Sequence, residues 1–453
     1  MSEFVTDIMR KNRIRITIGV AGLCLSLGGV SCRYEGGHME FAGYTPHERY
    51  EYGLRAAGLD ETALGRDWLA AAGRALEAPV AISPPYSEVS YMDAGEAGAV
   101  GYAMSLRRGE KVTARFDLVS DTTYRVFLDM FVMPTGARSN PVLLTSADTN
   151  SNGIEYTARR DGDYVVRIQP ELLRGGRYTI TVEVGGSLDF PVEGHDHAAI
   201  RSFWGDWRSG GRTHQGVDIF APRGTPVLAA TDGTVRSTRP NNLGGKVVWL
   251  RDELGRSQYY AHLDSQVVRR GDRVQAGDTI GFVGNTGNAR TTPPHLHFGI
   301  ASRGWFDPMP ALAAPSAPAP EFSGDSELIG GVVRANADRT RVRIEPGARS
   351  RAVANLDRHT PLSVVAGIGR WYRVMLPDGS TGFVESRFIE PANQPIRSEL
   401  LASGALLRES PMPTAAATDS LVAGQHVPVL GAYGGFLLVL APSGRAGWLV
   451  LDM

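Results

Sequence analysis

The spacing of hydrophobic and polar residues changes several times along this chain, and each change predicts a different kind of structure. Apolar residues in the stretch 44–79 recur at roughly helical intervals, which predicts two short helices with a break near Gly58. From residue 85 to residue 188 the period becomes two, and polar residues alternate with Tyr178, Ile180, Val182 and Val184. This alternation is typical of half-buried strands and predicts a β-sandwich.

The C-terminal part of the chain contains an internal repeat. Three motifs recur with one offset of 65 residues: 343–346 as 408–411, 371–374 as 436–439, and 382–384 as 447–449. Equal offsets in separate motifs indicate two copies of one small β module, at 328–391 and 393–453. An Ala- and Pro-rich stretch at 311–327 precedes them and predicts a semi-extended linker.

The region between the sandwich and the linker, residues 189–310, contains the residue types of a metal-assisted hydrolase. They are His214, Asp218, His262, His295 and His297. Histidine and aspartate are ligands that zinc takes, and three protein ligands with a fourth position left to water are the pattern of a catalytic zinc. The two remaining histidines are then free to transfer protons.

The spacing of these residues has a structural reason. His295 and His297 lie two apart in a predicted strand, so their side chains project from the same face. Tyr260 and His262 have the same spacing, which places Tyr260 beside the site as an aid to the oxyanion or as a groove wall. Gly216 lies in the predicted turn between His214 and Asp218, where glycine allows backbone conformations that other residues avoid.

At these motifs the chain resembles the lysostaphin/LytM-type zinc endopeptidases, which cut peptide cross-links in bacterial peptidoglycan. The residues that carry the resemblance are 212–214, 216–218, 260–263, 284–288 and 294–298. The resemblance implies that His214, Asp218 and His297 are the zinc ligands and that His262 and His295 are the catalytic pair. It also implies a small antiparallel, barrel-like β fold with a groove.

Other regions resemble known modules as well. Residues 85–188 resemble the pre-peptidase β-sandwich domains of secreted bacterial proteases, and each C-terminal repeat resembles a bacterial SH3-like domain. The predicted fold is therefore mainly β and multidomain. It comprises a short helical segment at 32–84, a β-sandwich, a LytM-type catalytic domain and two small SH3-like barrels. Trp371 and Trp448 are expected in the cores of the barrels.

The N-terminus has the layout of an export signal. Basic residues precede a mostly apolar stretch from 16 to 30, which predicts a signal peptide at 1–31. The residues before Cys32 resemble a bacterial lipoprotein signal, except that Gly29 stands where an aliphatic residue is preferred. Ordinary signal-peptidase cleavage nearby is the alternative. Since Cys24 is the one other cysteine, the mature domains must be held by their cores rather than by disulfides.

The sequence thus predicts a zinc-dependent endopeptidase with one Zn²⁺ per chain, acting on stem peptides of peptidoglycan. In a Gram-negative host the expected bond is the cross-bridge from D-Ala to diaminopimelate. A lipid anchor at Cys32 is expected to hold the protein at the periplasmic face of a bacterial membrane. The net charge of −1 gives no reason to expect nucleic-acid binding. The alternative function is a non-enzymatic wall-binding regulator of another hydrolase.

Two further alternatives concern the mechanism and the repeats. His295 is assigned as the base that takes the proton of water, and His262 as the group that bonds the oxyanion or protonates the leaving amine. The reverse order stays open. The two C-terminal modules are expected to fold without the catalytic domain and to tether the enzyme to the wall, or else to cover the groove and restrain it.

Overall fold

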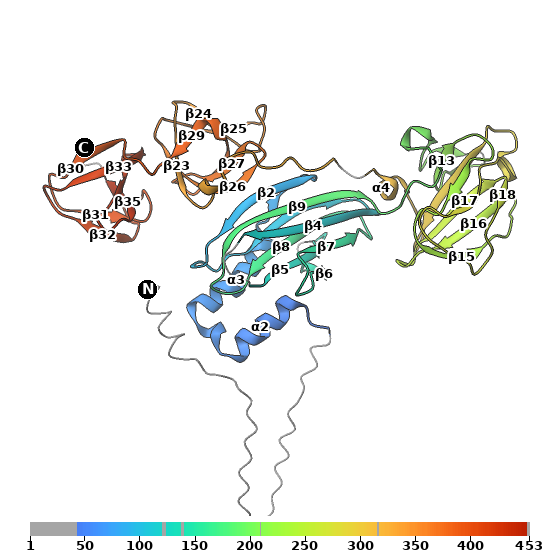
Figure 1. The fold of residues 1–453 in the computed structure, drawn as a ribbon, viewed down its shortest axis with the longest axis horizontal. Coiled ribbons are helices and arrows are strands. Elements are labelled where there is room, and N and C mark those ends of the chain that lie inside the picture. The colour runs from blue at the N-terminus through green and yellow to red at the C-terminus, as the bar shows by residue number, and fades with distance from the viewer. Residues whose placement is uncertain (1–42, 120–123, 137–139, 209, 315–316, 451–453) are drawn as a thin grey trace, which may run out of the picture. The chain divides into compact units, whose positions relative to one another are not determined.

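A computed structural model describes residues 43–119, 124–136, 140–208, 210–314 and 317–450 (Figure 1). The chain divides into two units, Met1–Gly43 and Tyr44–Met453, and the elements below all belong to the second. The predicted signal peptide and Cys32 lie outside the described residues. The described chain is mainly β with few helices, as predicted. No helix in its described part is long and apolar enough to cross a membrane.

Two short helices precede the first sheet. α2 (Pro46–Ala56) begins with a capping box, in which the side chains of Thr45 and Glu48 each bond the other residue's backbone N–H. Gly58 follows with a φ of +67°, then η1 (Leu59–Glu61) and α3 (Ala63–Glu77). The buried Trp68 of α3 donates a hydrogen bond from Nε1 to the carbonyl oxygen of Pro170 at 2.8 Å. The helices are therefore anchored on the β domain that follows.

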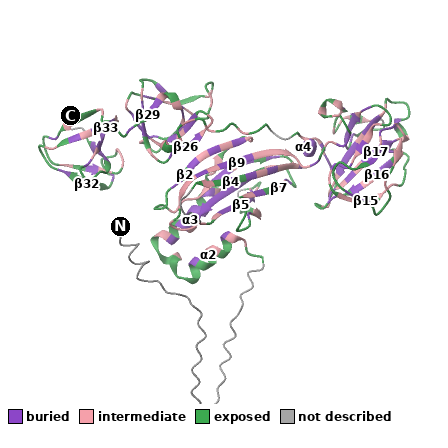
Figure 2. Cartoon of the chain, viewed as in Figure 1, coloured by how far each residue is buried: buried purple, intermediate pink, exposed green. Residues whose placement is uncertain are grey.

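That domain is a sandwich of two sheets around one apolar core. One sheet has the strand order β1-β3-β8-β5-β6, and the other includes β2-β9-β4-β7. β5 and β8 are buried along nearly their whole length (Figure 2), because the helical segment packs on one side of their sheet. The strands are β1 (Val80–Ala81), β2 (Tyr86–Met92), β3 (Val100–Leu106), β4 (Glu110–Val119), β5 (Val126–Val132), β6 (Val142–Ser146), β7 (Gly153–Thr157), β8 (Gly162–Pro170) and β9 (Gly176–Gly186).

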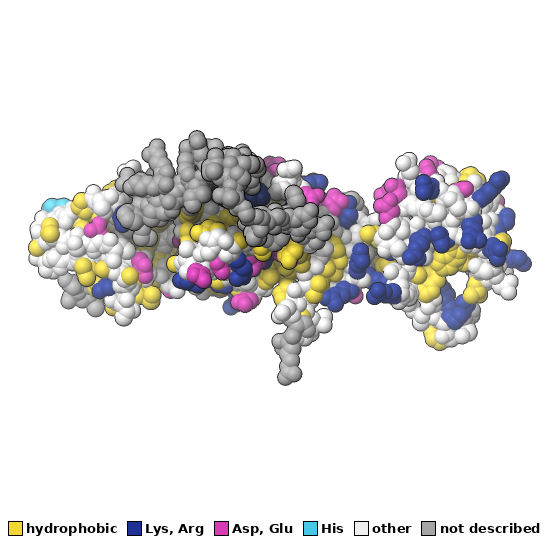
Figure 3. Space-filling model, turned by 90° about the horizontal axis from the view of Figure 1, so that it is seen from below, with side chains coloured by type: hydrophobic (Ala, Val, Ile, Leu, Met, Phe, Trp, Pro, Cys, Tyr) yellow, Lys and Arg dark blue, Asp and Glu magenta, His cyan; other side chains and the backbone are white. Residues whose placement is uncertain are grey.

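The third region is a second β domain with its own apolar core. Its main sheet has the order β10-β13-β21-β17-β16-β15-β19, with β22 beside β21, and β14-β20-β18 form a smaller sheet. Lys and Arg side chains are prominent on the face of this domain seen in Figure 3. Its strands are β10 (Ile200–Ser202), β11 (Trp207–Arg208), β12 (Arg212–Thr213), β13 (Val217–Phe220), β14 (Pro226–Leu228), β15 (Gly233–Ser237), β16 (Lys246–Arg251), β17 (Ser257–Leu263), β18 (Ser265–Gln266), β19 (Arg273–Val274), β20 (Thr279–Phe282), β21 (His295–Ala301) and β22 (Trp305–Phe306).

The end of this domain differs from the predicted boundary. The linker is expected from residue 311, but α4 (Met309–Leu312) packs Ala311 and Leu312 into the domain core. Gly186 N–H of β9 also donates to the carbonyl oxygen of Ala313 at 2.7 Å. The reason is that these alanine and leucine side chains bury apolar surface, whereas composition alone indicates an exposed linker.

The two C-terminal modules repeat strand for strand. β24 begins at Thr340 and β31 at Ala405, and the four strands that follow keep the same offset of 65 residues. Their antiparallel pairings are also equivalent. The strands are β23 (Val332–Ala335), β24 (Thr340–Arg343), β25 (Ala352–Leu356), β26 (Pro361–Ile368), β27 (Trp371–Met375), β28 (Thr381–Glu385) and β29 (Ile389–Pro391), then β30 (Arg397–Leu400), β31 (Ala405–Arg408), β32 (Ala417–Leu421), β33 (His426–Tyr433), β34 (Phe436–Leu440) and β35 (Ala446–Val450).

The first module is joined directly to the sandwich. β26 pairs antiparallel with β2, at Ala366 with Ser90 and Gly367 with Val89. Beside this pairing, Arg373 Nη2 lies 2.8 Å from Oε1 of Glu88, which is completely buried. The hydroxyls of Tyr86 and Tyr102 donate to the same carboxylate at 2.5 and 2.8 Å. The first module thus extends one sheet of the sandwich, which the sequence does not reveal.

Candidate metal centre

Three neighbouring strands carry four of the five predicted site residues, and the segment after β12 brings the fifth, His214, to them. Asp218 lies in β13, His295 and His297 lie in β21, and His262 lies in β17. Asp218 stands directly opposite His297, which in turn stands opposite Ala261 of β17. His214 follows β12, and its backbone N–H donates to the carbonyl oxygen of Asp206. Residues up to 83 positions apart in the sequence thus meet on one face of the sheet.

Three of these side chains converge on one point. The distance from His214 Nε2 to His297 Nδ1 is 2.9 Å, and Asp218 Oδ1 lies 3.1 Å from the former and 3.0 Å from the latter. A tetrahedral zinc with bonds of about 2.0–2.1 Å spaces its ligand atoms by about 3.3 Å. The triangle therefore has nearly the dimensions of one face of a zinc tetrahedron. Within the described residues these three form the candidate metal-binding group.

Surrounding groups fix the orientation of the three side chains. His214 Nδ1 lies 2.9 Å from the carbonyl oxygen of Phe203. A carbonyl oxygen only accepts, so Nδ1 carries the proton and Nε2 offers its lone pair to the triangle. Arg208 Nη2 donates to Oδ2 of Asp218 at 2.7 Å and leaves Oδ1 to face the histidines. Such outer contacts are what a metal site requires of its ligands.

The charge of Asp218 also suits a ligand. Burial raises the pKa of its carboxyl, but the nearby imidazoles of His214 and His297, which favour the ionised carboxylate, lower it by more. The pKa therefore lies well below the ordinary value, and the carboxylate is ionised at neutral pH. A hard anionic oxygen beside two imidazole nitrogens is a donor set that zinc accepts.

Gly216 serves the site differently from the prediction. Its φ is not in the left-handed region, so the expected special backbone conformation is wrong. A Cβ at this position would instead lie 2.9 Å from His297 Nε2 and 2.5 Å from the carbonyl oxygen of Phe298. Glycine is needed because the ring of His297 occupies the space of a side chain.

His262 reaches the site through a β-bulge. The register between β16 and β17 shifts between Lys246 and Val248, and His262 has a φ of +63° in the left-handed region. A bulge re-aims the side chain that it carries. His262 therefore stands next to His295, with ring centroids 5.0 Å apart, although strict alternation would point it into the core.

The bulge also corrects the prediction for Tyr260. Its spacing from His262 suggested a shared face, but Tyr260 is completely buried in the core, and its hydroxyl bonds Gln258 and the backbone N–H of Ala230. Tyr260 is neither a groove wall nor an aid to the oxyanion. The tyrosine on the site face is its neighbour Tyr259, whose ring centroid is 5.9 Å from that of His297.

His262 and His295 share one arrangement. His262 Nδ1 lies 2.9 Å from the carbonyl oxygen of Thr286, and His295 Nδ1 lies 2.9 Å from that of Pro293. Each Nδ1 therefore carries the proton, and each Nε2 is a proton acceptor. His295 Nε2 is 4.0 Å from Asp218 Oδ1, beside the triangle. Burial, followed by the positive charge of His295, lowers the pKa of His262 to about 4.

An aromatic cluster that no sequence motif indicates lies next to His297. The ring centroids of Trp249 and Tyr259 are 4.5 Å apart, and Trp305 is 5.6 Å from Trp249 and 5.9 Å from Tyr259. These residues come from β16, β17 and β22, so no local motif connects them. Gly299 makes room for them, because a Cβ there would lie 2.7 Å from the ring of Trp305.

Comparison with protein families identifies this domain. Residues 212–308 match the model of peptidase family M23. The chain contains an M23 peptidase domain. Residues 338–390 match a second model, the bacterial SH3 domain, which corresponds to the first C-terminal module. The predicted resemblances to LytM-type peptidases and, for the first C-terminal module, to a bacterial SH3 domain are thereby confirmed.

Known proteins match the chain mainly around the M23 domain. An L-Ala–D-Glu endopeptidase of Bacillus subtilis is 37% identical over 143 residues, 28% of this chain and 44% of the relative. The peptidoglycan DD-endopeptidase ShyC of Vibrio cholerae is 42% identical over 87 residues, 19% of this chain and 20% of the relative. The chain thus spans less than half the length of these relatives. The solved catalytic domain of lysostaphin from Staphylococcus simulans is 37% identical, with 24% of this chain and 89% of that chain covered and a TM-score of 0.23.

Proposed function

We propose that this protein is a zinc-dependent endopeptidase that hydrolyses peptide cross-links of bacterial peptidoglycan. The observation that carries the proposal is the triangle of His214, Asp218 and His297, with two more histidines beside it. The relatives of the M23 domain include endopeptidases named for bonds of peptidoglycan stem peptides. A purely wall-binding regulator would need neither the converging lone pairs nor the two imidazoles.

The chain's own residues would handle the protons of the reaction. His214, Asp218 and His297 would hold the zinc, which when bound polarises the scissile carbonyl and lowers the pKa of water. Nε2 of His295 is an acceptor next to the triangle, so it can take the proton of the attacking water. Neutral His262 also presents an acceptor at Nε2. It therefore cannot donate to an oxyanion before it gains a proton, which favours a role in passing a proton to the leaving amine.

Digestion of purified peptidoglycan tests the proposal. The zinc-loaded chain should release soluble muropeptides, a chelator should stop the release, and added Zn²⁺ should restore it. His262→Ala and His295→Ala should keep one zinc per chain, measured by elemental analysis, and lose cleavage. A zinc-loaded wild-type protein that binds sacculi but releases nothing would support the non-enzymatic alternative. Cleavage at the wild-type rate by either variant would contradict its catalytic role.

We also propose export and a lipid anchor at Cys32, on the strength of the N-terminal sequence. Mass spectrometry of the mature protein should show cleavage before Cys32 and an acylated cysteine. Cys32→Ser should release the protein from membrane fractions, and Cys24→Ser serves as the control that should not. An unmodified N-terminus would contradict the anchor without bearing on the M23 domain.

The C-terminal modules are proposed to tether the enzyme to the wall and thereby raise the local concentration of substrate. Truncation near residue 310 would remove Ala311 and Leu312 from the core of the M23 domain, and removal of the first module would take away β26, which continues a sheet of the sandwich. The truncation that leaves both domains intact therefore removes only the second module, after residue 391. Cleavage of intact sacculi should weaken while cleavage of soluble muropeptides stays unchanged. Faster soluble cleavage would support restraint of the groove instead.

A further inference from the structure

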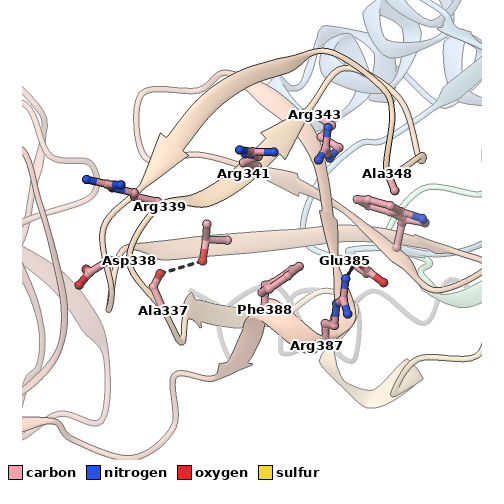
Figure 4. A pocket seen from close by; sticks show the side chains of 11 residues that line it. Ala337, Asp338, Arg339, Arg341, Arg343, Ala348, Glu385, Arg387 and Phe388 are labelled. Carbon is pink, nitrogen blue, oxygen red and sulfur yellow. Dashed lines mark hydrogen bonds and ion pairs between the residues drawn. The ribbon is translucent and has the colours of Figure 1, made fainter.

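The first SH3-like module contains a pocket with a cavity volume of about 370 Å³ (Figure 4). It lies between β24 and the segment from the end of β28 into η5 (Ser386–Phe388). The aromatic side chains of Trp371 and Phe388 form part of its wall. Trp371 is 7% exposed and so is buried, as expected, although it lies outside the main apolar cluster of the module and also lines this pocket.

The pocket is rich in arginine. Because β24 alternates, Val342 is buried, while Arg341 and Arg343 line the pocket. Arg339, in the turn just before β24, lines it as well (Figure 4). Arg343 is engaged, since its Nη1 donates to the carbonyl oxygen of Ser350. Arg339 and Arg341 are exposed, and in the described part of the chain neither side chain forms an ion pair.

Further charges complete the lining. Arg387 Nη2 lies 3.0 Å from Oε2 of the buried Glu385, and its guanidinium lies over the ring of Phe388. Glu385 is also 3.2 Å from Arg370, so it is already neutralised. Asp338 is the second carboxylate of the lining. Four arginines against two carboxylates give the pocket an excess of positive charge, and Arg339 and Arg341 are the ones free to receive a ligand.

The second module provides an internal comparison. Arg343 and its equivalent Arg408 make the same contact, since Arg408 Nη1 donates to the carbonyl oxygen of Ala415 at 2.7 Å. This arginine therefore supports the fold of both modules. The positions equivalent to Arg339 and Arg341 are Gly404 and Leu406. The module folds without these two charges, so stability does not explain them.

From this pocket we propose that the first module, and not the second, binds the free carboxylates of peptidoglycan stem peptides through Arg339 and Arg341. The inference rests on the proposed function and names a second contact with the same polymer. Arginine binds carboxylates with paired N–H donors. Arg341 lies in β24 and Arg339 in the turn just before it, so two guanidinium groups at the same edge of the pocket can meet two carboxylates of one peptide. The aromatic wall of Trp371 and Phe388 suits a peptide backbone, which a phosphate polymer lacks.

Binding of an uncross-linked muropeptide to the full chain, measured in the presence of a chelator so that the M23 domain does not cleave the ligand, tests this proposal. The decisive variant is Arg339→Gly with Arg341→Leu, which installs the residues of the second module. Glycine tolerates the φ of +57° at position 339, so the exchange does not strain the backbone. The matched control is Arg349→Gly with Arg351→Leu, which removes two exposed arginines of the same module outside the pocket.

Calorimetric titration should show at least tenfold weaker binding by the pocket variant and less than a twofold change for the control. A muropeptide with amidated carboxylates should bind the wild type as weakly as the free muropeptide binds the pocket variant. Inorganic phosphate should not compete. Unchanged binding by the pocket variant, equal binding of the amidated ligand, or competition by phosphate would each overturn the proposal. Because the titration does not depend on cleavage, failure of the proposed enzymatic activity is distinguishable from failure of this site.

Discussion

Two clusters of buried polar side chains in this protein each contain a carboxylate. They differ in whether the lone pairs of their polar atoms already accept hydrogen bonds. In the M23 domain, nitrogen and oxygen atoms of His214, Asp218 and His297 converge to within 3.1 Å of one another. Between the sandwich and the first module, the carboxylate of Glu88 receives Tyr86, Tyr102 and Arg373. In the first cluster Nδ1 of His214 donates to the backbone carbonyl oxygen of Phe203, so the lone pair of Nε2 points toward the other two side chains. In the second, both carboxylate oxygens already have donors.

The difference separates a binding site from a structural contact. When histidine nitrogens and a carboxylate oxygen converge with no proton between them, their lone pairs repel one another. A bound cation removes this repulsion. A buried carboxylate that accepts from two hydroxyls and a guanidinium needs nothing further, and it fixes how the two domains meet. Burial and charge alone therefore do not identify a site. The geometry of the unshared lone pairs does.

Removal of one ligand should give the largest effect. His297→Ala should lower zinc affinity by at least about 100-fold, since even the loss of an outer contact to a ligand costs about 10–100-fold. Peptidoglycan cleavage should be lost with the metal. Elemental analysis and muropeptide release measure the two effects. His195→Ala, a histidine of the same domain outside the triangle, is the control, and full zinc occupancy in His297→Ala would refute the ligand set.

The second cluster predicts a loss of stability without a loss of chemistry. Arg373→Leu should destabilise the protein by about 3–5 kcal/mol, because it leaves the carboxylate of Glu88 buried and unpaired. Leucine is the residue of the second module at this position, Leu438, so the module itself accepts it. Chemical denaturation measures the effect, and zinc binding should not change.

A control and a rescue sharpen this test. Arg370→Leu removes an exposed arginine of the same module and should cost no more than about 1 kcal/mol. The double variant Glu88→Leu with Arg373→Leu should recover much of the lost stability, because no unpaired charge remains. Equal losses for Arg370→Leu and Arg373→Leu would show that the buried pair does not join the two domains.

The histidines beside the triangle predict a pH effect on stability. The pKa of His262 falls from 6.5 to about 4 in the folded state. Below pH 6.5 the unfolded chain therefore binds a proton that the folded chain does not, and stability falls as the pH decreases toward 4. The effect of this residue saturates at about 3 kcal/mol. Denaturation of metal-free protein between pH 4 and 7 should show a shallower slope in His262→Asn than in the wild type, and identical slopes would contradict the lowered pKa.

The smallest expected effect concerns the aromatic cluster. Trp305→Ala should raise KM for soluble muropeptides several-fold with little change in kcat, as expected for a residue that contacts bound substrate away from the reacting atoms. Zinc content should stay at one per chain. Leu254→Ala, an exposed apolar residue in the turn between β16 and β17, is the control. A fall in kcat at unchanged KM would instead place Trp305 in the chemical step.

The sequence by itself determined the residue types of the metal centre, the β character of each region and the 65-residue repeat. Those features depend on local spacing and on which side chains can bind zinc, and both can be read from a linear pattern. Only the tertiary structure decided which face His262 and Tyr260 occupy, because a single bulge reverses the alternation from which their common face is predicted. It also decided the role of Gly216, which depends on a ring from a strand about 80 residues away. The aromatic cluster, the pairing of β2 with β26 and the partners of Glu88 follow from contacts between segments far apart in the chain, and no local period records such contacts.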